Sequence, residues 1–554
     1  MTDLVKLTKQ QKLLIMIGAM SALFLAALDQ TIVATATPKI VAEFNGFDKL
    51  TWIFTAYMLA ATITVPIYGK LSDIYGRRIF YLLAIVIFLI GSIFSGVSQN
   101  MIELILARAV QGIGAGSIMA NSFAIIGDLF VPAERSRWQG LFAGAWGLAS
   151  VVGPTLGGYF TDHISWRWNF FINIPIGILS FAFIYFLMPK IITHAREKSI
   201  DYIGAIFLTL TLISLLLGFV WGGSQYAWQS WQEIGLFVLS FFSLCAFIAN
   251  EKKAEDPIIP LTLFQNPIFT TSMILVFISG VAMFGIILYI PLFAQIVLGI
   301  SATNSGAILT PLTLGLVIAS VVSGQISSHR GTYKSLIIFG IEMMTLGVFL
   351  LSRMDIHTSP YSLALFMIIS GIGMGITLPL FTVIVQNAFD HSKLGVVTAS
   401  TQLFRSIGGT VGTAVMGSIV NNALHQKLSN LSGDIFISTY GKYISSINIE
   451  HLSINQIQLL VANSKQATSQ LAKLPNPINK FALLSFSSFI EKVRIALSSS
   501  IAEIYAIATL LLLLAIGLSY LLKEIPLKEH NQPIKDGEIE NLDKATGSEL
   551  ASYH

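Results

Sequence analysis

The sequence predicts an all-α membrane protein with fourteen transmembrane helices, and three observations support this prediction. Apolar residues make up 54% of the 554-residue chain, whereas charged residues make up only 11%, compared with ~25% in soluble globular proteins. The mean hydropathy is +0.73. The apolar residues are gathered in runs of about 20, the length that a helix needs to cross the hydrocarbon core of a bilayer.

Each of these runs is expected to form one membrane-spanning helix. The first run carries Asp29 and no small-residue cleavage site, so we interpret it as a helix and not as a cleaved signal peptide. In chain order, the expected spans are 13–36, 52–71, 79–97, 102–127, 139–160, 170–188, 202–222, 233–249, 269–293, 304–327, 335–352, 361–385, 397–420 and 501–522.

An even number of spans places both termini on one side of the membrane, and the basic residues indicate which side. If both termini are cytoplasmic, the cytoplasmic segments hold 20 of the 33 lysines and arginines, and the short loops opposite hold four. Cytoplasmic loops of membrane proteins are enriched in these residues. We therefore expect cytoplasmic termini. No basic stripe suggests a nucleic-acid partner.

A repeated turn motif suggests two related halves. The second and tenth spans are each followed by a similar cytoplasmic segment, 69–78 and 324–334, as in transporters built from repeats. Spans seven and eight are then an inserted pair. The expected parts are an N-terminal six-helix bundle, the inserted pair, a C-terminal six-helix bundle and a cytoplasmic tail, over 1–190, 191–267, 268–522 and 523–554.

The last bundle is expected to contain a long extracytoplasmic insert over 421–500. This segment is rich in serine, asparagine, glutamine and lysine. It is expected to contain helical stretches such as 454–474. The insert either covers the surface as a cap or guides the substrate.

Charged residues inside the spans are the first candidates for a chemical role. A carboxylate at bilayer depth costs ~2.5–3.5 kcal/mol on insertion scales and is a functional hypothesis by default. Asp29 lies in the first span and Glu342 in the eleventh, and the nine histidines fall in loops or the tail. A proton relay in this chain would therefore use a carboxylate.

Asp29 and Arg108, the latter in the fourth span, are predicted to form the proton-coupling pair. Protonated Asp29 is neutral, whereas the ionised carboxylate needs a cation, which Arg108 or a cationic substrate can supply. Proton and substrate would then compete for Asp29, which is the basis of antiport. The alternative is a fixed structural ion pair between two helices.

Other polar residues in the spans are candidates for a substrate cavity. Glu342 is either a second titrating group or a protonated residue facing protein. Arg405 either contacts an anionic substrate or pairs with backbone carbonyls. The full candidate set is Tyr57, Gln111, Gln295, Glu342 and Arg405.

Several chemistries have no support in the sequence. There is no nucleotide-binding loop of the G-x-x-x-x-G-K-[ST] type, no nucleophile elbow, and no histidine or cysteine cluster with metal-ligand spacing. We therefore expect no enzyme, no metal site and no cofactor, with a proton gradient as the energy source.

Four motifs, in chain order, resemble those of the major facilitator superfamily. The resemblance is to its fourteen-helix drug:proton antiporter branch, which includes the quaternary-ammonium and methyl-viologen resistance pumps. It covers residues from about 10 to 425 and again from about 500 to 522, and the stretch 166–175 adds to it. The matching segments are 28–33 with Pro38, 69–78, 108–116, and 153–158 preceded by Gly147.

The resemblance implies that the segment 69–78 latches the outward-open state of an alternating-access transporter. Asp73 would face the N-terminal end of the thirteenth span near Gly395, and Arg77 would pair with Asp128. The alternative is that the arginines merely keep the loop in the cytoplasm. The expected latch residues are Gly69, Asp73, Gly76, Arg77, Arg78 and Asp128.

The glycine-proline motif of the fifth span is similar to the antiporter motif of the family. Its glycines would allow close helix packing, and its proline would bend the helix. In the family this span packs between the two halves and biases the protein toward export. The motif residues are Gly147, Gly153, Pro154, Gly157 and Gly158.

Together these features predict a proton-coupled antiporter that exports amphipathic, cationic drugs or toxic compounds by alternating access. We expect it to work as a monomer in a bacterial plasma membrane. One alternative is a dedicated exporter of a lipid, siderophore or peptide. Another is an uptake symporter, which the glycine-proline motif argues against. A non-transporting sensor or anchor would leave the intramembrane charges unexplained.

Overall fold

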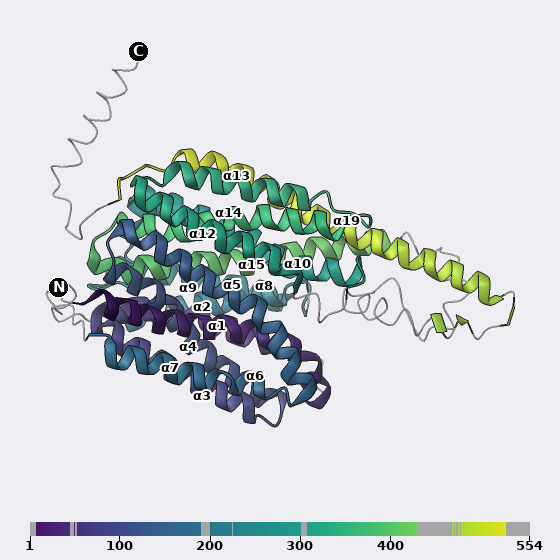
Figure 1. Ribbon diagram of the computed structural model, residues 1–554, viewed down its shortest axis with the longest axis horizontal. Helices are drawn as coiled ribbons and strands as arrows, with labels where there is room; N and C mark the ends of the chain where they lie inside the picture. The colour runs from purple at the N-terminus through teal and green to yellow at the C-terminus, as the bar shows by residue number, and fades with distance from the viewer. Residues whose placement is uncertain are drawn as a thin grey trace, which may run out of the picture.

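The computed structural model describes residues 7–44, 49, 52–189, 200–223, 225–300, 307–429, 436, 468–469, 471–472, 475–476 and 478–527. Within these residues, fourteen helices are long and apolar enough to cross a membrane. They pack side by side along a common direction (Figure 1). The predicted all-α class and the predicted number of spans are therefore confirmed.

The first six spans pack against one another in the lower half of Figure 1. α4 contacts α2 and α3, and α1 contacts α5 and α7, around fully buried apolar side chains such as Ile85 and Phe88. The sixth span is broken at Ile172 into two helices. The bounds are α1 (Lys9–Phe44), α2 (Trp52–Tyr75), α3 (Arg77–Val97), α4 (Met101–Leu129), α5 (Pro132–His163), α6 (Trp168–Phe171) and α7 (Asn173–Leu187).

The last six spans pack in the upper half of Figure 1. α14 contacts α12 and α13, while α19 contacts α10, α13 and α15. A short 3-10 turn, η3 (Ala307–Leu309), precedes α12. The bounds are α10 (Pro267–Ile296), α12 (Thr310–Arg330), α13 (Lys334–Leu351), α14 (Pro360–Asn387), α15 (Leu394–Ser429) and α19 (Ile478–Tyr520).

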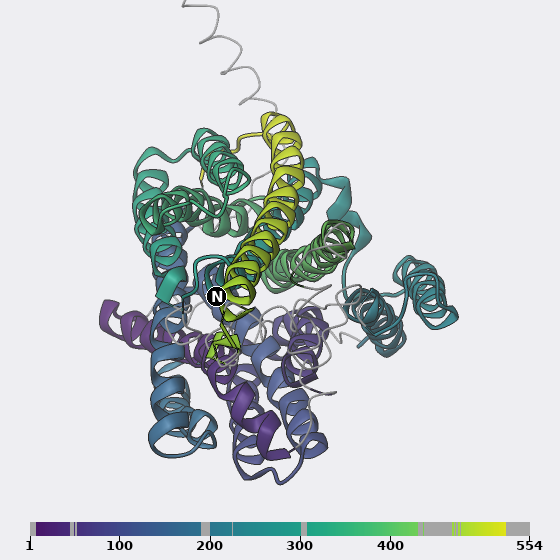
Figure 2. The same cartoon turned by 90° about the vertical axis from the view of Figure 1, so that its right-hand side faces the viewer.

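The two remaining spans, α8 (Tyr202–Trp221) and α9 (Trp231–Glu251), stand at one side of the two bundles (Figure 2). They pack on each other, and α8 also contacts α2 and α15. Lys70 at the end of α2 forms an ion pair with Asp256, which follows α9, at 3.0 Å. The inserted pair is therefore attached to both bundles by contacts of α8, by the Lys70–Asp256 ion pair and by a hydrogen bond from Trp228 to Ser418 of α15 at 3.1 Å.

Both copies of the repeated turn motif bring the two bundles together. A Cβ added to Gly69 on α2 would lie 2.5 Å from the Cβ of Ala399 on α15, and one added to Gly324 on α12 would lie 2.5 Å from a backbone oxygen of α5. Each motif then turns through a glycine at positive φ, 97° at Gly76 and 69° at Gly331, which favours glycine. These turns lie at the end of the molecule where α1 begins and α19 ends, which we call the cytoplasmic end.

The helices on either side of the predicted extracytoplasmic insert extend beyond the spans expected there. α15 continues to Ser429 and α19 begins at Ile478, so helix extends into both ends of the segment 421–500. The prediction 454–474 lies largely outside the described residues, as does the tail beyond residue 527.

The early start of α19 has a physical reason. Its outer part buries Ala482, Phe486, Phe489 and Val493, a spacing of three to four residues that gives one apolar side. At 1.5 Å per residue its 43 residues measure roughly 65 Å, twice the ~30 Å of a bilayer core. α19 therefore projects well beyond the bundle (Figure 1).

Close packing of α13 and α14 makes a first prediction about stability. A Cβ added to Gly373 on α14 would lie 2.6 Å from the carbonyl oxygen of Gly340, so we expect Gly373→Ala to destabilise the fold by about 1–3 kcal/mol. Gly517→Ala on α19 is the matched control, because nothing lies within 4 Å of its added Cβ. Thermal unfolding midpoints in detergent would separate the two. Equal midpoints would contradict the packing argument.

Candidate functional site

A buried polar cluster surrounds Asp29 in the middle of the N-terminal bundle. The Asp29 side chain is fully buried and forms an ion pair with Arg108 of α4. Its Oδ1 atom accepts hydrogen bonds from Gln111 Nε2 at 2.7 Å and from Asn173 Nδ2 at 2.9 Å. All of these donors are N–H groups, so both carboxylate oxygens act as acceptors, as expected of an ionised carboxylate.

The guanidinium of Arg108 is held from several sides. It donates to Gln111 Oε1 at 2.7 Å and to the backbone carbonyl of Ile53 at 3.3 Å. It also lies 4.3 Å from the ring centroid of Tyr57, whose hydroxyl donates to the carbonyl of Ala26 at 3.2 Å. Tyr57 and Gln111, predicted as cavity residues, are therefore members of the Asp29 cluster.

Asn173 is a cluster member that the sequence prediction did not assign to Asp29. It is the first residue of α7, directly after the break at Ile172. Pro175, two residues on, has no N–H and so leaves the carbonyl of Phe171 without its usual helical donor. Asn173 Nδ2 also donates to Ser92 Oγ on α3 at 2.9 Å. The signal available in the sequence was an asparagine just before a proline within an apolar run.

Asp29 therefore touches two other spans, α4 and α7, through one carboxylate. Protonation would remove the acceptor charge that holds Arg108 and would free the donors of Gln111 and Asn173 from a charged partner. Protonation of Asp29 would therefore alter contacts of α1, α4 and α7 at the same time. This arrangement is chemically suited to couple a proton to the packing of the bundle.

A second charged cluster joins the two bundles at the cytoplasmic end. Arg77 forms ion pairs with Asp73 and with Asp128 Oδ2, the latter at 3.0 Å, and all three side chains are buried. Asp73 accepts from the backbone N–H groups of Gly395 and Val396 at 3.1 and 3.0 Å. These are the first N–H groups of α15, where a helix favours a negative charge.

Arg78 does not belong to this cluster, contrary to the prediction. Its guanidinium donates to the carbonyl of Tyr185 on α7 at 2.5 Å and lies 5.3 Å from the centre of that ring. The reason is helical phase, because consecutive residues at the start of α3 point about 100° apart. Arg78 therefore connects α3 to α7 within one bundle.

The residues of the fifth-span motif face two different partners. Gly147 faces α12, where an added Cβ would lie 2.6 Å from Thr313. Gly153 and Gly157 face α1, and an added Cβ at Gly157 would lie 2.5 Å from the carbonyl oxygen of Ile32. Pro154 lies inside α5 between these contacts. Gly158 departs from the prediction of close packing, since nothing lies within 4 Å of its added Cβ.

The remaining cavity candidates do not converge on the Asp29 cluster. Glu342 is half-buried on α13, which packs on α14 and α19 within the C-terminal bundle. Gln295 is half-buried near the end of α10. Arg405 on α15 donates to Gln402 Oε1 and to the carbonyl of Leu378.

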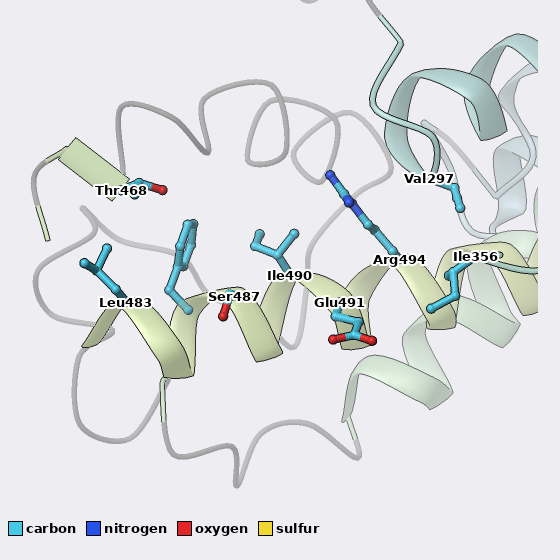
Figure 3. A pocket seen from close by; sticks show the side chains of 9 residues that line it. Val297, Ile356, Thr468, Leu483, Ser487, Ile490, Glu491 and Arg494 are labelled. Atoms are coloured by element: carbon cyan, nitrogen blue, oxygen red, sulfur yellow. The ribbon is translucent and has the colours of Figure 1, made fainter. Parts of the chain in front are cut away.

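A cavity of about 570 Å³ lies beside the outer part of α19 (Figure 3). Arg494 and Glu491 contribute its charged groups, and Val297 and Ile356 line it from the C-terminal bundle. It shares no residue with the Asp29 cluster or with the cluster around Arg77.

The Asp29–Arg108 pair makes a prediction about stability. Removing one partner of a buried ion pair leaves an uncompensated charge, so Arg108→Leu should destabilise the fold by about 3–5 kcal/mol. The same change made in an Asp29→Asn protein should cost much less, because no bare carboxylate remains. Unfolding midpoints of the two single variants and the double variant would measure the coupling. Equal effects of Arg108→Leu in both backgrounds would contradict the pairing.

Comparison with known proteins places the chain in a family. Residues 19–413 match the family model described as Major Facilitator Superfamily. Two similar relatives come from Bacillus subtilis (strain 168). Multidrug transporter protein MdtP is 36% identical over 533 residues, which cover 95% of this chain and 96% of the relative. Multidrug resistance protein 3 is 40% identical over 416 residues, which cover 75% and 81%.

Solved structures agree on the fold. The human organic anion transporter MFSD10 (TETRAN) aligns with a TM-score of 0.56 at 13% identity, covering 90% of this chain and 99% of that chain. At this identity the likeness concerns the fold alone. From the family match and the multidrug relatives, we conclude that the chain belongs to the drug-efflux branch of the major facilitator superfamily and is a membrane transporter, not an enzyme.

Proposed function

We propose that this protein is a proton-coupled exporter of amphipathic compounds that works by alternating access. The observation that carries the proposal is the Asp29 cluster, in which one carboxylate contacts Arg108, Gln111 and Asn173 from two other spans. The additional neutral donors give the carboxylate partners that persist through a change of protonation.

The cluster around Arg77 supports a two-state cycle. Asp73 joins α2 to the start of α15. Arg77 forms ion pairs with both Asp73 and Asp128, and so connects this contact to α4. Gln386 of α14 also donates to the carbonyl of Phe123 on α4 at 3.2 Å. These contacts close the cytoplasmic end between the bundles. Their opening would expose the path between the bundles to the cytoplasm, as alternating access requires.

The remaining features of the proposal follow the family and the sequence. The energy source is the proton gradient, without a cofactor, and the unit is a monomer of two six-helix bundles with an inserted pair in a bacterial plasma membrane. The substrates are amphipathic compounds that include cationic drugs. Relatives named as multidrug transporters support this choice over a dedicated lipid, siderophore or peptide exporter.

Removal of the titrating group should uncouple transport from protons. In proteoliposomes with an imposed pH gradient, we expect Asp29→Asn to lower substrate-dependent proton movement roughly tenfold or more. Asp162→Asn is the matched control, because Asp162 is exposed at the end of α5. If the Asp29→Asn protein transports at the parental rate and still follows the pH gradient, the coupling assignment is wrong.

Loss of the charge at Asp73 should open the cytoplasmic end. A hydrogen bond to a charged group contributes about 1.5–3 kcal/mol, so Asp73→Asn should raise the ratio of cytoplasm-open to cytoplasm-closed molecules roughly 10- to 100-fold. Spin labels at positions 134 and 330, in a protein with the exposed Cys245 replaced by serine, would report the distance between the two bundles.

Asp390→Asn is the control for this experiment, since Asp390 is an exposed acid in the loop before α15. It should leave the distance distribution unchanged. An unchanged distribution in the Asp73→Asn protein would mean that the cluster does not control the cytoplasmic end.

A further inference from the structure

Two side chains of α15, Gln402 and Arg405, present hydrogen-bond donors that have no acceptor. Arg405 Nη1 donates to Gln402 Oε1 at 3.1 Å, and Nη2 donates to the carbonyl of Leu378 on α14 at 3.3 Å. Arg405 Nε and Gln402 Nε2 are buried and have no hydrogen-bond partner. Gln402 as a whole is 8% exposed. Burying polar groups without partners is costly, so this α15 donor pair needs an explanation.

The charge of the α15 donor pair is also uncompensated. In the N-terminal bundle, Arg77 and Arg108 both form ion pairs with buried carboxylates. Within the described chain, no ion pair includes Arg405. Among the acids of the described C-terminal spans, Glu342 lies on α13, which does not pack closely on α15, and Glu503 of α19 pairs with Lys427. A half-buried guanidinium with a buried, unpartnered donor is chemically suited to bind an anion.

The α15 donor pair lies on the helix that meets the N-terminal bundle. Ala399, one turn before Gln402, packs against Val65 of α2 and Ala120 of α4. At 1.5 Å per residue, Gln402 and Arg405 are ~12–17 Å from the cytoplasmic start of α15. They therefore lie just beyond the contact that closes the cytoplasmic end. When that end is closed, the pair is on the extracytoplasmic side of the contact, where an exporter releases its substrate.

We propose that Gln402 and Arg405 bind an anionic group, such as a carboxylate, of the transported compound. A guanidinium presents a planar fork of donors that matches a carboxylate, and Gln402 Nε2 adds a further donor beside it. The inference rests on the proposed export function and narrows its substrate class to amphipathic compounds that carry an anionic group, zwitterions included. Compounds that are only cationic gain nothing from this pair.

The test compares two probes that differ in one charge, a rhodamine with a free carboxylate and its methyl ester. Fluorescence polarisation with the purified full-length protein in detergent measures their binding without any transport. We expect the parent protein to bind the acid about tenfold more tightly than the ester. Arg405→Gln and Gln402→Leu should each reduce this preference, and Arg405→Gln should abolish it. Arg405→Lys should retain part of it.

The controls separate this site from general effects. Arg353→Gln removes the same charge from an exposed position and should keep the preference, and unchanged ester binding shows that the variants are folded. Absence of acid binding, or an equal preference in the parent and in Arg405→Gln, overturns the proposal. Displacement of the acid by phosphatidylglycerol would assign the pair to a lipid headgroup instead.

Failure of the proposed function would look different. In that case the acid preference and its loss in Arg405→Gln would be present in the binding assay, but uptake of either rhodamine into everted vesicles would not respond to an imposed pH gradient. Conversely, gradient-driven uptake with no acid preference would retain the exporter and reject the anion site.

Discussion

A charge inside a bilayer must be neutralised by the protein, and this constraint organises the N-terminal bundle. The Asp29 carboxylate cannot reach water, so α1 must present it to Arg108 of α4 and to Asn173 of α7. The ion pair requires that the sides of α1 and α4 that carry these residues face each other. The broken sixth span is part of the same solution, because the break places Asn173 at the beginning of α7.

The two bundles carry the same turn motif but use different charges at it. In the N-terminal copy, Asp73 reaches across to the start of α15. The C-terminal copy has Ser328 where an acid would stand. There, Glu524 accepts from the backbone N–H groups of Tyr333 and Lys334 at the start of α13. In both cases a carboxylate sits at the start of a helix of the C-terminal bundle, but only Asp73 reaches it from the other bundle.

The sequence allowed accurate prediction of what depends on hydropathy and on the pairing of rare intramembrane charges. The number of spans follows from the apolar runs, and Arg108 was the available cation for Asp29 in the first six spans. Helical phase was harder to predict. Arg78 follows Arg77, which belongs to the cytoplasmic cluster, but Arg78 contacts Tyr185 on α7 instead. Gly158 follows Gly157, which packs against α1, but nothing lies within 4 Å of a Cβ added to Gly158. The early start of α19 was not predicted, because the polar composition of this segment suggested a loop, whereas the spacing of its apolar residues favours a helix.

One helix connects the Asp29 cluster to the cytoplasmic end in the proposed cycle. α4 carries Arg108 at one cluster and Asp128 at the other, 20 residues or ~30 Å along the helix. Between them, Gly114 leaves no room for a side chain, because an added Cβ would lie 2.5 Å from the backbone nitrogen of Phe88 on α3. A contact of this kind is rigid, because the atoms nearest to Gly114 belong to the main chain of α3 and not to a flexible side chain. A shift of α4 caused by protonation of Asp29 would therefore also displace Asp128. Because Arg77 is paired with both Asp128 and Asp73, this displacement would change the contact between Asp73 and α15.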